Sequence, residues 1–331
     1  MSRLLANRNI RKDFDLCAVS DISYDDVTVV DRLVTDGRSN FLRKLPSRLG
    51  GLSANGLCAV TELFSLRSAI GTVIGDDDDG DAACRELESH GVSTAYVESL
   101  AGRQTCRNTV IMDESSRLCV RNGNARLSGC TISSLKSVIA RSRCAILRVN
   151  STSSLAELSA FGRRLECVVA IVPTDRQLND VAELACDLLA CNVDESRHAT
   201  SLCGNVSAGT AFRKLINLTD ARYVVQTGGG TEPTLLFDRD EGRIRNVMPA
   251  NTALIRPPRS CLNPCGTGDV ALAATCSRLL AGETLADAFA NWGRLLATAH
   301  LVDVKFATAD HYIDWLAEHS DAFSRPSANA A

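Results

Sequence analysis

Short apolar runs alternate along the chain with amphipathic segments. The apolar runs cover residues 15–19, 68–75, 144–149, 167–172, 187–192 and 223–228. They lack a polar face, which is typical of parallel strands buried on both sides. The helical candidates between them cover residues 53–66, 80–90, 155–165, 176–186 and 206–217. This alternation predicts repeated β-α-β units around one mostly parallel sheet, and therefore an α/β fold.

Several stretches depart from this alternation. Residues 234–238 and 243–249 read as strands around the turn Asp240-Glu241-Gly242, which predicts a β-hairpin at the sheet edge. Segments of about 21–47 and 95–127 contain short strands with alternating polar and apolar residues, so we expect a small second sheet that projects from the main one. The ends, residues 1–12 and 321–331, are expected to be flexible.

Composition narrows the class of partner. The 331 residues are 45% hydrophobic and 23% charged, with a net charge of −3, so nothing indicates nucleic acid or an anionic membrane as a partner. No apolar run is long enough to cross a bilayer. The 14 cysteines include no CxxC pair and follow no secretory leader pattern, so we expect reduced core thiols and a cytoplasmic location. The acidic run 76–79 is interpreted as a solvated turn and helix start rather than a metal site.

A glycine-rich turn stands directly before a helix of small residues, in the stretch CLNPCGTGDVALAA at residues 261–274. Gly266 and Gly268 have no Cβ, so the turn can direct successive N–H groups into one concavity and let a ligand approach the backbone. The helix that begins near Asp269 adds its positive N-terminal end to the same place. The pattern therefore predicts an anion site.

Asp269 is a carboxylate beside this anion site, where it would repel a bound phosphate. Its presence is explained if it accepts the proton of a hydroxyl that attacks the phosphate, and a general base of this kind contributes about 10²- to 10⁴-fold to the rate. The glycine N–H groups would then stabilise the charge that builds on the transferred phosphoryl group. The alternative is that Asp269 only caps the helix and that the glycines only shape a turn.

Residues 263–269 resemble the C-terminal signature, roughly DTxGAGD, of the PfkB/ribokinase family of sugar and nucleoside kinases. Residues 48–97 are similar to the N-terminal signature of this family, with its double glycine, asparagine and glycine–acid turn. CNVDES at 191–196 is similar to the NxxE element, and VVQTGGGTEPTLLF at 224–237 to the nucleotide-side strand and hairpin. The order and spacing match from about residue 15 to about residue 319.

The resemblance implies one ribokinase-like domain over residues 13–320, with three α/β/α layers around a mostly parallel sheet. The two irregular segments at about 21–47 and 95–127 would form a small β-sheet lid. The implied activity is transfer of the γ-phosphoryl group of ATP to a sugar hydroxyl, with ATP and Mg²⁺ as cofactors. Because the exposed edges of a lid need covering, we also expect a homodimer through the lid.

The resemblance also implies roles for individual residues. The predicted catalytic residues are Asp269 as the general base and Gly266, Thr267 and Gly268 as the anion hole. The predicted acceptor-binding residues are Asp25, Gly50, Gly51, Asn55 and Asn150. The predicted nucleotide-binding residues are Asn192, Glu195, Thr227, Gly228, Gly230 and Asn291, and Glu195 would act on Mg²⁺ through water.

Several of these positions also have a structural alternative. Asp25 could be a solvated loop acid, and Asp26 gives an equally good register for the acceptor-binding carboxylate. Glu195 could be only the first-turn acid of a helix, where the helix dipole favours negative charge. Asn192 could be only a turn residue, and Asn291 could simply face solvent.

Departures from the family pattern bear on the substrate. Asn263 and Pro264 replace aspartate and threonine, which is similar to the branch that acts on phosphorylated ketohexoses. That branch has a lysine where this chain has Leu52, and the loss of that charge favours an unphosphorylated sugar or polyol. The arginines that could compensate are Arg107, Arg121 and Arg148.

Two other kinds of function stay open. One is a phosphosugar kinase, similar to those for fructose or tagatose phosphates, or a nucleoside kinase; the aromatic content of 5% offers no evident stacking platform for a nucleoside. The other is a relative without turnover that binds a sugar or nucleotide as a regulatory protein.

Overall fold

The central element of the protein is one large sheet. The computed structural model describes residues 12–34, 37–51, 53–113, 117–127, 132–174, 177–200, 206–228, 232–251, 254, 266–302 and 309–323. Within these residues the sheet has nine strands in the order β14-β13-β12-β11-β10-β9-β1-β5-β6. Their bounds are β1 Phe14–Ser20, β5 Ser68–Gly75, β6 Val92–Leu100, β9 Ser142–Arg148, β10 Val168–Ile171, β11 Leu188–Asn192, β12 Tyr223–Thr227, β13 Thr234–Asp238 and β14 Arg243–Val247. From β12 to β6 all neighbours are parallel, and β12, β13 and β14 are antiparallel.

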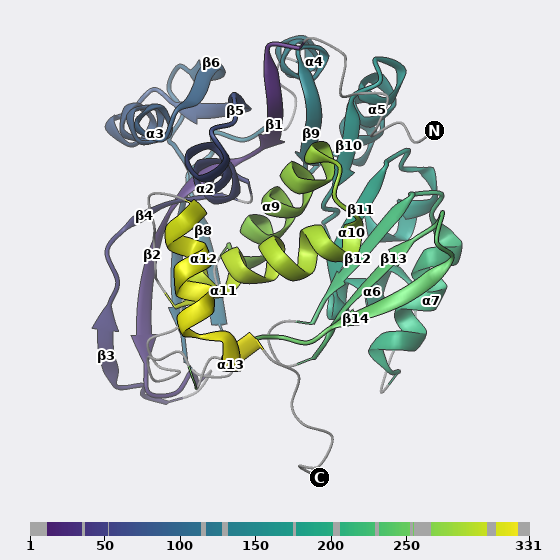
Figure 1. Ribbon diagram of the computed structural model, residues 1–331. Coiled ribbons are helices and arrows are strands. Elements are labelled where there is room, and N and C mark those ends of the chain that lie inside the picture. The colour runs from purple at the N-terminus through teal and green to yellow at the C-terminus, as the bar shows by residue number, and fades with distance from the viewer. Residues whose placement is uncertain are drawn as a thin grey trace.

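Helices cover both faces of this sheet (Figure 1). One face carries α2 Ala54–Phe64, α3 Asp78–Ser89, α9 Thr267–Ala281, α11 Arg294–Leu301 and α12 Ala309–Glu318. The other carries α4 Ile132–Ala140, α5 Thr152–Arg164, α6 Val193–Ala199 and α7 Ala208–Leu218. Alternate residues of β9 enter the two cores: Cys144 and Ile146 pack with the first layer, and Ala145 and Leu147 with the second. Because strand side chains alternate between faces, this pattern produces the three layers.

The predicted mostly parallel sheet is confirmed, and all six apolar runs are strands. The helix predicted over residues 176–186 is wrong, because a 3₁₀-helix occupies only Leu178–Glu183. The side chain of Gln177 accepts from the N–H of Thr174 and donates to the carbonyl oxygen of Val149, which ties the start of this segment to the end of β9. The predicted helix after Thr284 is present, but it continues from α10 Leu285–Asp287 through a π-helical segment, Ala288–Gly293, into α11.

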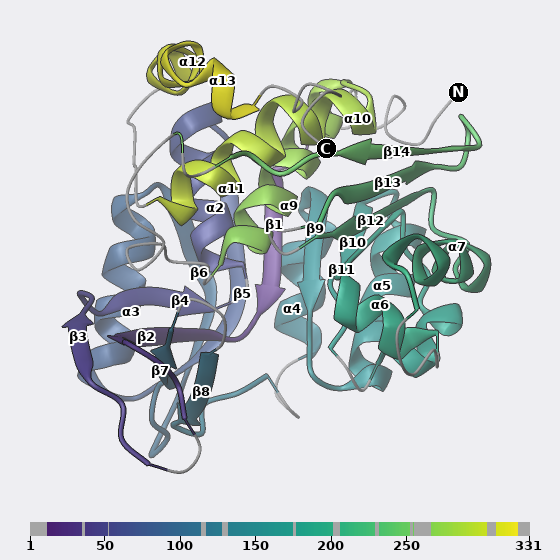
Figure 2. The ribbon, with the colours of Figure 1, turned by 90° about the horizontal axis from the view of Figure 1, so that it is seen from below.

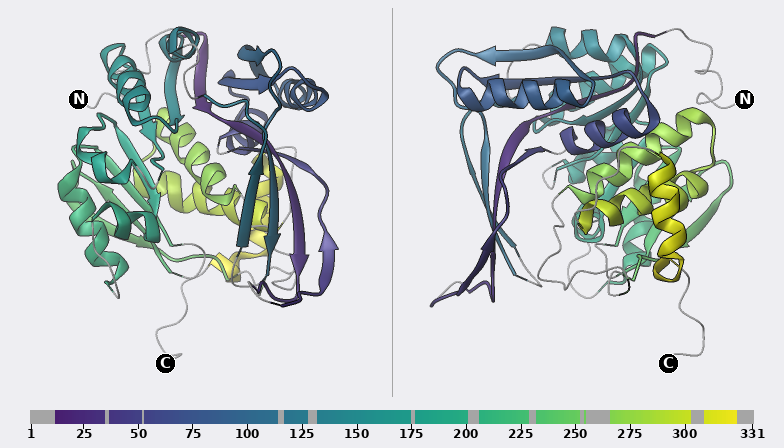
Figure 3. Two further views of the ribbon diagram at one scale, coloured as in Figure 1. Left: turned by 180° about the vertical axis from the view of Figure 1, so that it is seen from behind. Right: turned by 60° about the vertical axis from the view of Figure 1, so that its left-hand side comes forward.

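A second, smaller sheet projects from the main one (Figure 3). It has the strand order β3-β2-β7-β8, and β4 also pairs with β2. The bounds are β2 Ile22–Val30, β3 Phe41–Lys44, β4 Arg48–Gly51, β7 Arg107–Met112 and β8 Arg117–Asn122. The start of the predicted segment 95–127 therefore belongs instead to β6 of the main sheet, and β4 extends the small sheet beyond residue 47. In Figure 2 the small sheet lies beyond the carboxyl end of β1.

Asp21 joins the two sheets, because it is the single residue between β1 and β2. Its carboxylate is 5% exposed. It accepts hydrogen bonds from the N–H of Leu127 at 2.8 Å and from Nδ2 of Asn150 at 2.9 Å, and it lies 3.5 Å from a guanidinium nitrogen of Arg121. Since buried charges need partners of this kind, Asp21 fixes where the small sheet meets the main sheet.

The acidic run at 76–79 contains the start of α3, as predicted, but Asp77 and Asp79 are not merely solvated, because they also bind Thr105 and Arg107. Asp77 caps α3 by accepting from the N–H of Gly80, and it accepts from both the N–H and the hydroxyl of Thr105. Asp79 accepts two hydrogen bonds from Arg107 of β7, at 2.7 and 2.8 Å, and Arg107 also donates to Asp26. The first turn of α3 thus holds the small sheet in place.

These contacts predict a pH-dependent contribution of Asp77 to stability. Burial opposes its ionisation, but the hydrogen bonds outweigh burial and hold its pKa below the ordinary value. Asp77→Ala should therefore cost about 1–2 kcal/mol at neutral pH. A carboxylate with a lowered folded-state pKa stabilises only while ionised, so the gap between wild type and variant should shrink as the pH falls below about 4.

Urea unfolding over this pH range measures the effect of Asp77→Ala. The control is Asp78→Ala, which removes the adjacent and exposed first-turn acid and should change stability by no more than about 0.5 kcal/mol. A gap that stays constant from neutral to acid pH would contradict this role of Asp77.

Candidate active site

The glycine turn forms the start of α9. Gly266 is the N-cap residue with φ of 83°, and α9 runs from Thr267 to Ala281. Asp269 lies in the first turn rather than at the cap, so the alternative that Asp269 is the N-cap is wrong. A Cβ built on Gly268 would meet no atom within 4 Å, which leaves space for a ligand next to the backbone there. The positive φ explains why residue 266 is glycine.

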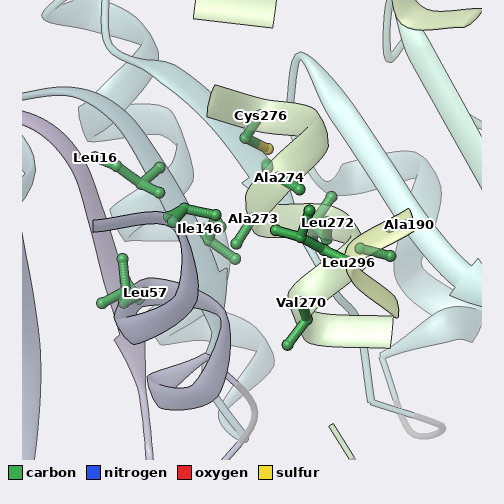
Figure 4. Close-up of a cluster of buried hydrophobic side chains, with 14 of the residues drawn as sticks. Leu16, Leu57, Ile146, Ala190, Val270, Leu272, Ala273, Ala274, Cys276 and Leu296 are labelled. Atoms are coloured by element: carbon green, nitrogen blue, oxygen red, sulfur yellow. The ribbon is translucent and has the colours of Figure 1, made fainter. Parts of the chain in front are cut away.

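Close packing of α2 on α9 fixes the position of this turn. A Cβ built on Gly56 of α2 would lie 2.7 Å from the backbone oxygen of Asp269 and 2.8 Å from Cβ of Ala273. On its other side α9 packs against β9, and Figure 4 shows the side chains of Leu57, Ile146 and Ala273 in this core. The first turn of α9 is therefore held at van der Waals distance from a neighbouring helix.

Two side chains approach the turn at Gly266. A Cβ on Gly266 would lie 3.0 Å from Nδ2 of Asn55 and 3.3 Å from Nε2 of His300. The structure thus brings the predicted acceptor residue Asn55 to the predicted anion hole. No role was predicted for His300 of α11, because no signal in the sequence connects it to a turn that precedes it by more than thirty positions.

The carboxylate of Asp25 lies in the small sheet. It accepts hydrogen bonds from Nδ2 of Asn108 at 2.7 Å and from the hydroxyl of Ser23 at 3.1 Å. A Cβ on Gly50 would lie 2.4 Å from Cγ of Asp25, so the carboxylate occupies the space that a side chain at Gly50 would fill. Asn108 is a residue that the sequence analysis missed, because only strand pairing between β2 and β7 brings it to Asp25.

Asp26 has a different set of partners. It accepts a hydrogen bond from Arg107 at 2.9 Å. Burial opposes the ionisation of Asp26, but hydrogen bonds from Ser47 and Arg107 outweigh it, so its pKa lies below the ordinary value. Since neighbouring strand residues point to opposite faces, Asp25 and Asp26 cannot share a role.

The remaining predicted acceptor residues lie beside Asp21. Gly51 has φ of 98°, and a Cβ there would lie 2.6 Å from the backbone oxygen of Asp21, so only glycine fits without strain. Asn150 donates to the carboxylate of Asp21 rather than standing alone. Gly50, Gly51 and Asn150 are thus brought together around the junction of the two sheets.

The predicted nucleotide residues lie at the carboxyl ends of β11 and β12. Asn192 and Glu195 form a reciprocal capping box at the start of α6, in which each side chain accepts from the backbone N–H of the other at 2.8 Å. Thr227 is the register partner of Asn192. A Cβ on Gly228 would lie 1.9 Å from the backbone oxygen of Glu232, so the turn requires glycine.

Two nucleotide-side predictions are less connected to this group. Asn291 is exposed in the π-helical segment. Gly230 lies outside the described residues. The main sheet nevertheless places the ends of β1, β9, β11 and β12 along one edge, where open α/β sheets bind ligands.

A metal would have few protein ligands here. Within the ranges that the structure describes, no group of three or more histidine, cysteine or acidic side chains could hold a metal ion. Mg²⁺ commonly takes only one or two carboxylates and completes its shell with water and phosphate oxygens. Glu195, at the same sheet edge as the glycine turn, is compatible with that sparse kind of site.

The cysteine that precedes Asn192 belongs to the core rather than to the site. Cys191, which precedes Asn192, is 4% exposed, and burial raises the pKa of its thiol, so this cysteine remains a protonated core residue. No disulfide is present among the described cysteines, and no described helix is both long and apolar enough to cross a membrane.

The comparisons with known proteins agree with this architecture. A model of the pfkB family carbohydrate kinases matches residues 13–292. The chain belongs to the pfkB family of carbohydrate kinases. A search of curated protein sequences found no match to this chain.

Solved structures extend the likeness to the whole fold. Ribokinase from Giardia lamblia superposes with a TM-score of 0.74 at 14% identity, covering 92% of this chain and 99% of that chain. Ribokinase from Arabidopsis thaliana, complexed with ribose and ATP, gives 0.68 at 17% identity, covering 92% and 98%. Adenosine kinase from Sinorhizobium meliloti gives 0.70 at 14% identity, covering 87% and 94%. The predicted ribokinase-like fold is confirmed.

The contact of α2 with α9 generates a stability prediction. Gly56→Ala places a methyl group against the backbone of Asp269 and should cost about 1–3 kcal/mol through overpacking. The matched control is Gly209→Ala in α7, where an added Cβ meets nothing within 4 Å. That substitution should stabilise by about 0.5–1 kcal/mol.

Urea unfolding of both variants of this pair decides the outcome. Equal effects of the two substitutions would mean that α2 does not constrain the first turn of α9.

Proposed function

We propose that this protein is an ATP-dependent sugar kinase that transfers the γ-phosphoryl group to a hydroxyl of a small carbohydrate. The observation that carries the proposal is the glycine turn at the start of α9, with open space at Gly268 and the carboxylate of Asp269 one position further on. Membership of the pfkB family supports it. Further support comes from the ribokinase with ribose and ATP and from a Cryptococcus neoformans ribokinase with ADP, which share the fold.

The proposed mechanism assigns the anion hole to the backbone. The N–H groups of Gly266, Thr267 and Gly268 and the positive end of α9 would stabilise the charge on the transferred phosphoryl group. Because α9 is already packed against α2, these donors need no reorganisation when the charge develops.

Asp269 would act as the general base. It would accept the proton of the attacking sugar hydroxyl at its carboxylate while the oxygen of that hydroxyl bonds to phosphorus. Asp25 would accept hydrogen bonds from other hydroxyls of the sugar, with its carboxylate oriented by Asn108 and Ser23. Asn55 lies beside Gly266 and would contact the sugar near the reacting hydroxyl.

The nucleotide would lie over the ends of β11 and β12, beside Asn192, Thr227 and Gly228. Mg²⁺ would supply charge neutralisation to the phosphates, and Glu195 is the residue that would orient it through water. The capping box holds the carboxylate of Glu195 in place at the start of α6. We place the activity in the cytoplasm, where thiols such as the buried ones here stay reduced.

A substitution at Asp269 tests the proposed chemistry. Purified protein with ATP, Mg²⁺ and a panel of sugars, sugar phosphates and nucleosides should form ADP. Asp269→Asn should lower turnover by about 10²- to 10⁴-fold, because the amide cannot accept the proton. Circular dichroism and thermal unfolding should show that the variant stays folded.

The control for this test is Asp287→Asn, which alters an exposed first-turn acid of α10 and should leave turnover unchanged. Full turnover by Asp269→Asn would rule out the base. Binding of sugar or nucleotide in calorimetry, with no ADP from any acceptor, would instead favour a regulatory binding protein.

The small sheet would act as a lid that excludes water from the reaction and pairs two copies of the chain. Its edge strands carry exposed apolar residues: Phe41 and Leu42 on β3, and Leu118 and Val120 on β8, each at least 49% exposed. Such edges are usually covered in a stable protein, so we propose a homodimer through the lid.

Light scattering tests this assembly. The wild type should have the mass of a dimer, and Leu118→Lys combined with Val120→Lys should shift it to a monomer by placing charge in the interface. A monomeric wild type would overturn the proposal. The matched control, Ile313→Lys on α12, alters an apolar residue of equal exposure and should leave the mass unchanged.

A further inference from the structure

Arg148 lies at the carboxyl end of β9 and has no role in the mechanism above. Cys144 and Ile146 of the same strand point to the face of the sheet that α9 covers. Because side chains alternate along a strand, Arg148 points to this face as well. Arg148 is the last residue of β9, two residues beyond Ile146, at the carboxyl edge of the sheet where the glycine turn lies.

Strand and helix geometry place Arg148 level with the first turn of α9. The thiols of Cys144 on β9 and Cys276 on α9 interact in the buried core, where Cys276 raises the pKa of Cys144, so the two elements are aligned at that point. From Cys144 to Arg148 the strand advances about 13 Å, at roughly 3.3 Å per residue. From Cys276 back to Asp269 the helix spans about 10 Å, at roughly 1.5 Å per residue. The two ends therefore reach the same level.

Two polar side chains at this place lack partners. Nε of Arg148 is buried, and no hydrogen bond to it is present among the described residues. Ser20 of β1 is the register partner of Arg148, is 0% exposed, and its hydroxyl also has no partner there. Alternation along β1, where Leu16 and Ala18 enter the α9-side core, directs Ser20 to the same face. Buried donors without partners are costly, and they are typical of groups that a ligand satisfies.

Arg148 differs in its ion pairing from Arg107 and Arg121, the two other arginines that could bind an acceptor phosphate. Arg107 is bound to Asp79 and Asp26, and Arg121 is paired with the buried Asp21. Arg148 forms no ion pair with a described residue, so its charge is the one that remains available. β9 is the neighbour of β1, which leads into the small sheet, and β10 separates it from β11. Arg148 therefore lies on the acceptor side of Asp269 rather than on the nucleotide side.

We propose that Arg148 and Ser20 form a subsite for an anionic group, a carboxylate or a phosphate, on the acceptor sugar. This inference rests on the proposed kinase function and narrows its acceptor to a charged sugar. It revises the preference for an uncharged sugar that followed from Leu52, because the positive charge comes from β9 instead of from the turn after Gly51. A guanidinium is suited to such a group since it can donate two parallel hydrogen bonds to two oxygens.

Matched acceptors test the subsite. Ribose, ribonate and ribose 5-phosphate form one set, and glucose, gluconate and glucose 6-phosphate form another. The wild type should favour an anionic member of a set in kcat/KM, and whether that member is the acid or the phosphate identifies the group. Arg148→Gln should lower kcat/KM for that acceptor by about 10- to 100-fold and leave the neutral sugar within about twofold.

Two further variants separate charge from geometry. Arg148→Lys should recover only part of the preference, because an ammonium cannot donate in the bidentate form. Arg164→Gln removes an exposed positive charge from the end of α5 and should change neither acceptor. A wild type that favours the neutral sugars, or an unchanged preference in Arg148→Gln, would overturn the subsite while leaving the kinase proposal intact.

Ser20→Ala adds a readout that a merely structural role would not move. Loss of an unsatisfied buried hydroxyl should leave the thermal unfolding temperature of the ligand-free protein unchanged or higher. The same variant should lower kcat/KM for the anionic acceptor. A lowered unfolding temperature with an unchanged preference would assign Ser20 to the core and count against the subsite.

The binding measurement distinguishes failure of this inference from failure of the kinase proposal. If no acceptor yields ADP, the unfolding temperature is measured with and without ribonate, ribose 5-phosphate, gluconate and glucose 6-phosphate. A rise in the wild type that is absent in Arg148→Gln supports the subsite without the kinase. No rise with any of them overturns it.

Discussion

The packing of α9 against α2 is the constraint on which the candidate site depends. Gly56 brings the backbone of α2 so close to Asp269 that no side chain fits between them. Ala273 continues this contact along α9, because a Cβ on Gly56 would lie 2.8 Å from its own Cβ. A helix held this closely cannot turn or slide without opening a void, and voids in a packed core are costly. The N–H groups at its start therefore keep one direction before any ligand arrives, as electrostatic stabilisation of a developing charge requires.

A second constraint places the small sheet over this fixed helix end. β1 continues into β2 with only Asp21 between them, and the carboxylate of Asp21 holds Asn150 from the loop after β9 and Arg121 from the small sheet. At the far side, Asp79 and Arg107 form a second attachment between α3 and β7. The hydrogen bonds and ion pairs at these two attachments therefore limit how far the small sheet can move relative to the main sheet.

The parts of the fold that follow from local pattern were predictable. Buried parallel strands have no polar face, so they are visible in the sequence as continuous apolar runs. The turn before α9 requires a positive φ at Gly266, which is visible as a glycine. The positions of Asn108 and His300 leave no such trace, because strand pairing and helix packing bring them to Asp25 and Gly266 from distant segments. The short 3₁₀-helix at Leu178 was missed because a tertiary hydrogen bond from Gln177 sets its start. Periodicity alone cannot register such a bond.

The charged residues on the proposed acceptor side favour an acceptor that carries an anionic group in addition to hydroxyls. Neutral sugars are bound mainly by carboxylates and amides, which Asp25, Asn55 and Asn108 supply. The half-buried side chain of Arg148 is not needed for that task, and its buried Nε has no hydrogen-bond partner among the described residues. Arg148 nevertheless occupies the end of a central strand, next to a serine hydroxyl that is equally unsatisfied. An anion between them would satisfy both groups at once. This chain has Leu52 where the branch for phosphorylated ketohexoses has lysine. Arg148 would supply the single cation that one anionic group needs.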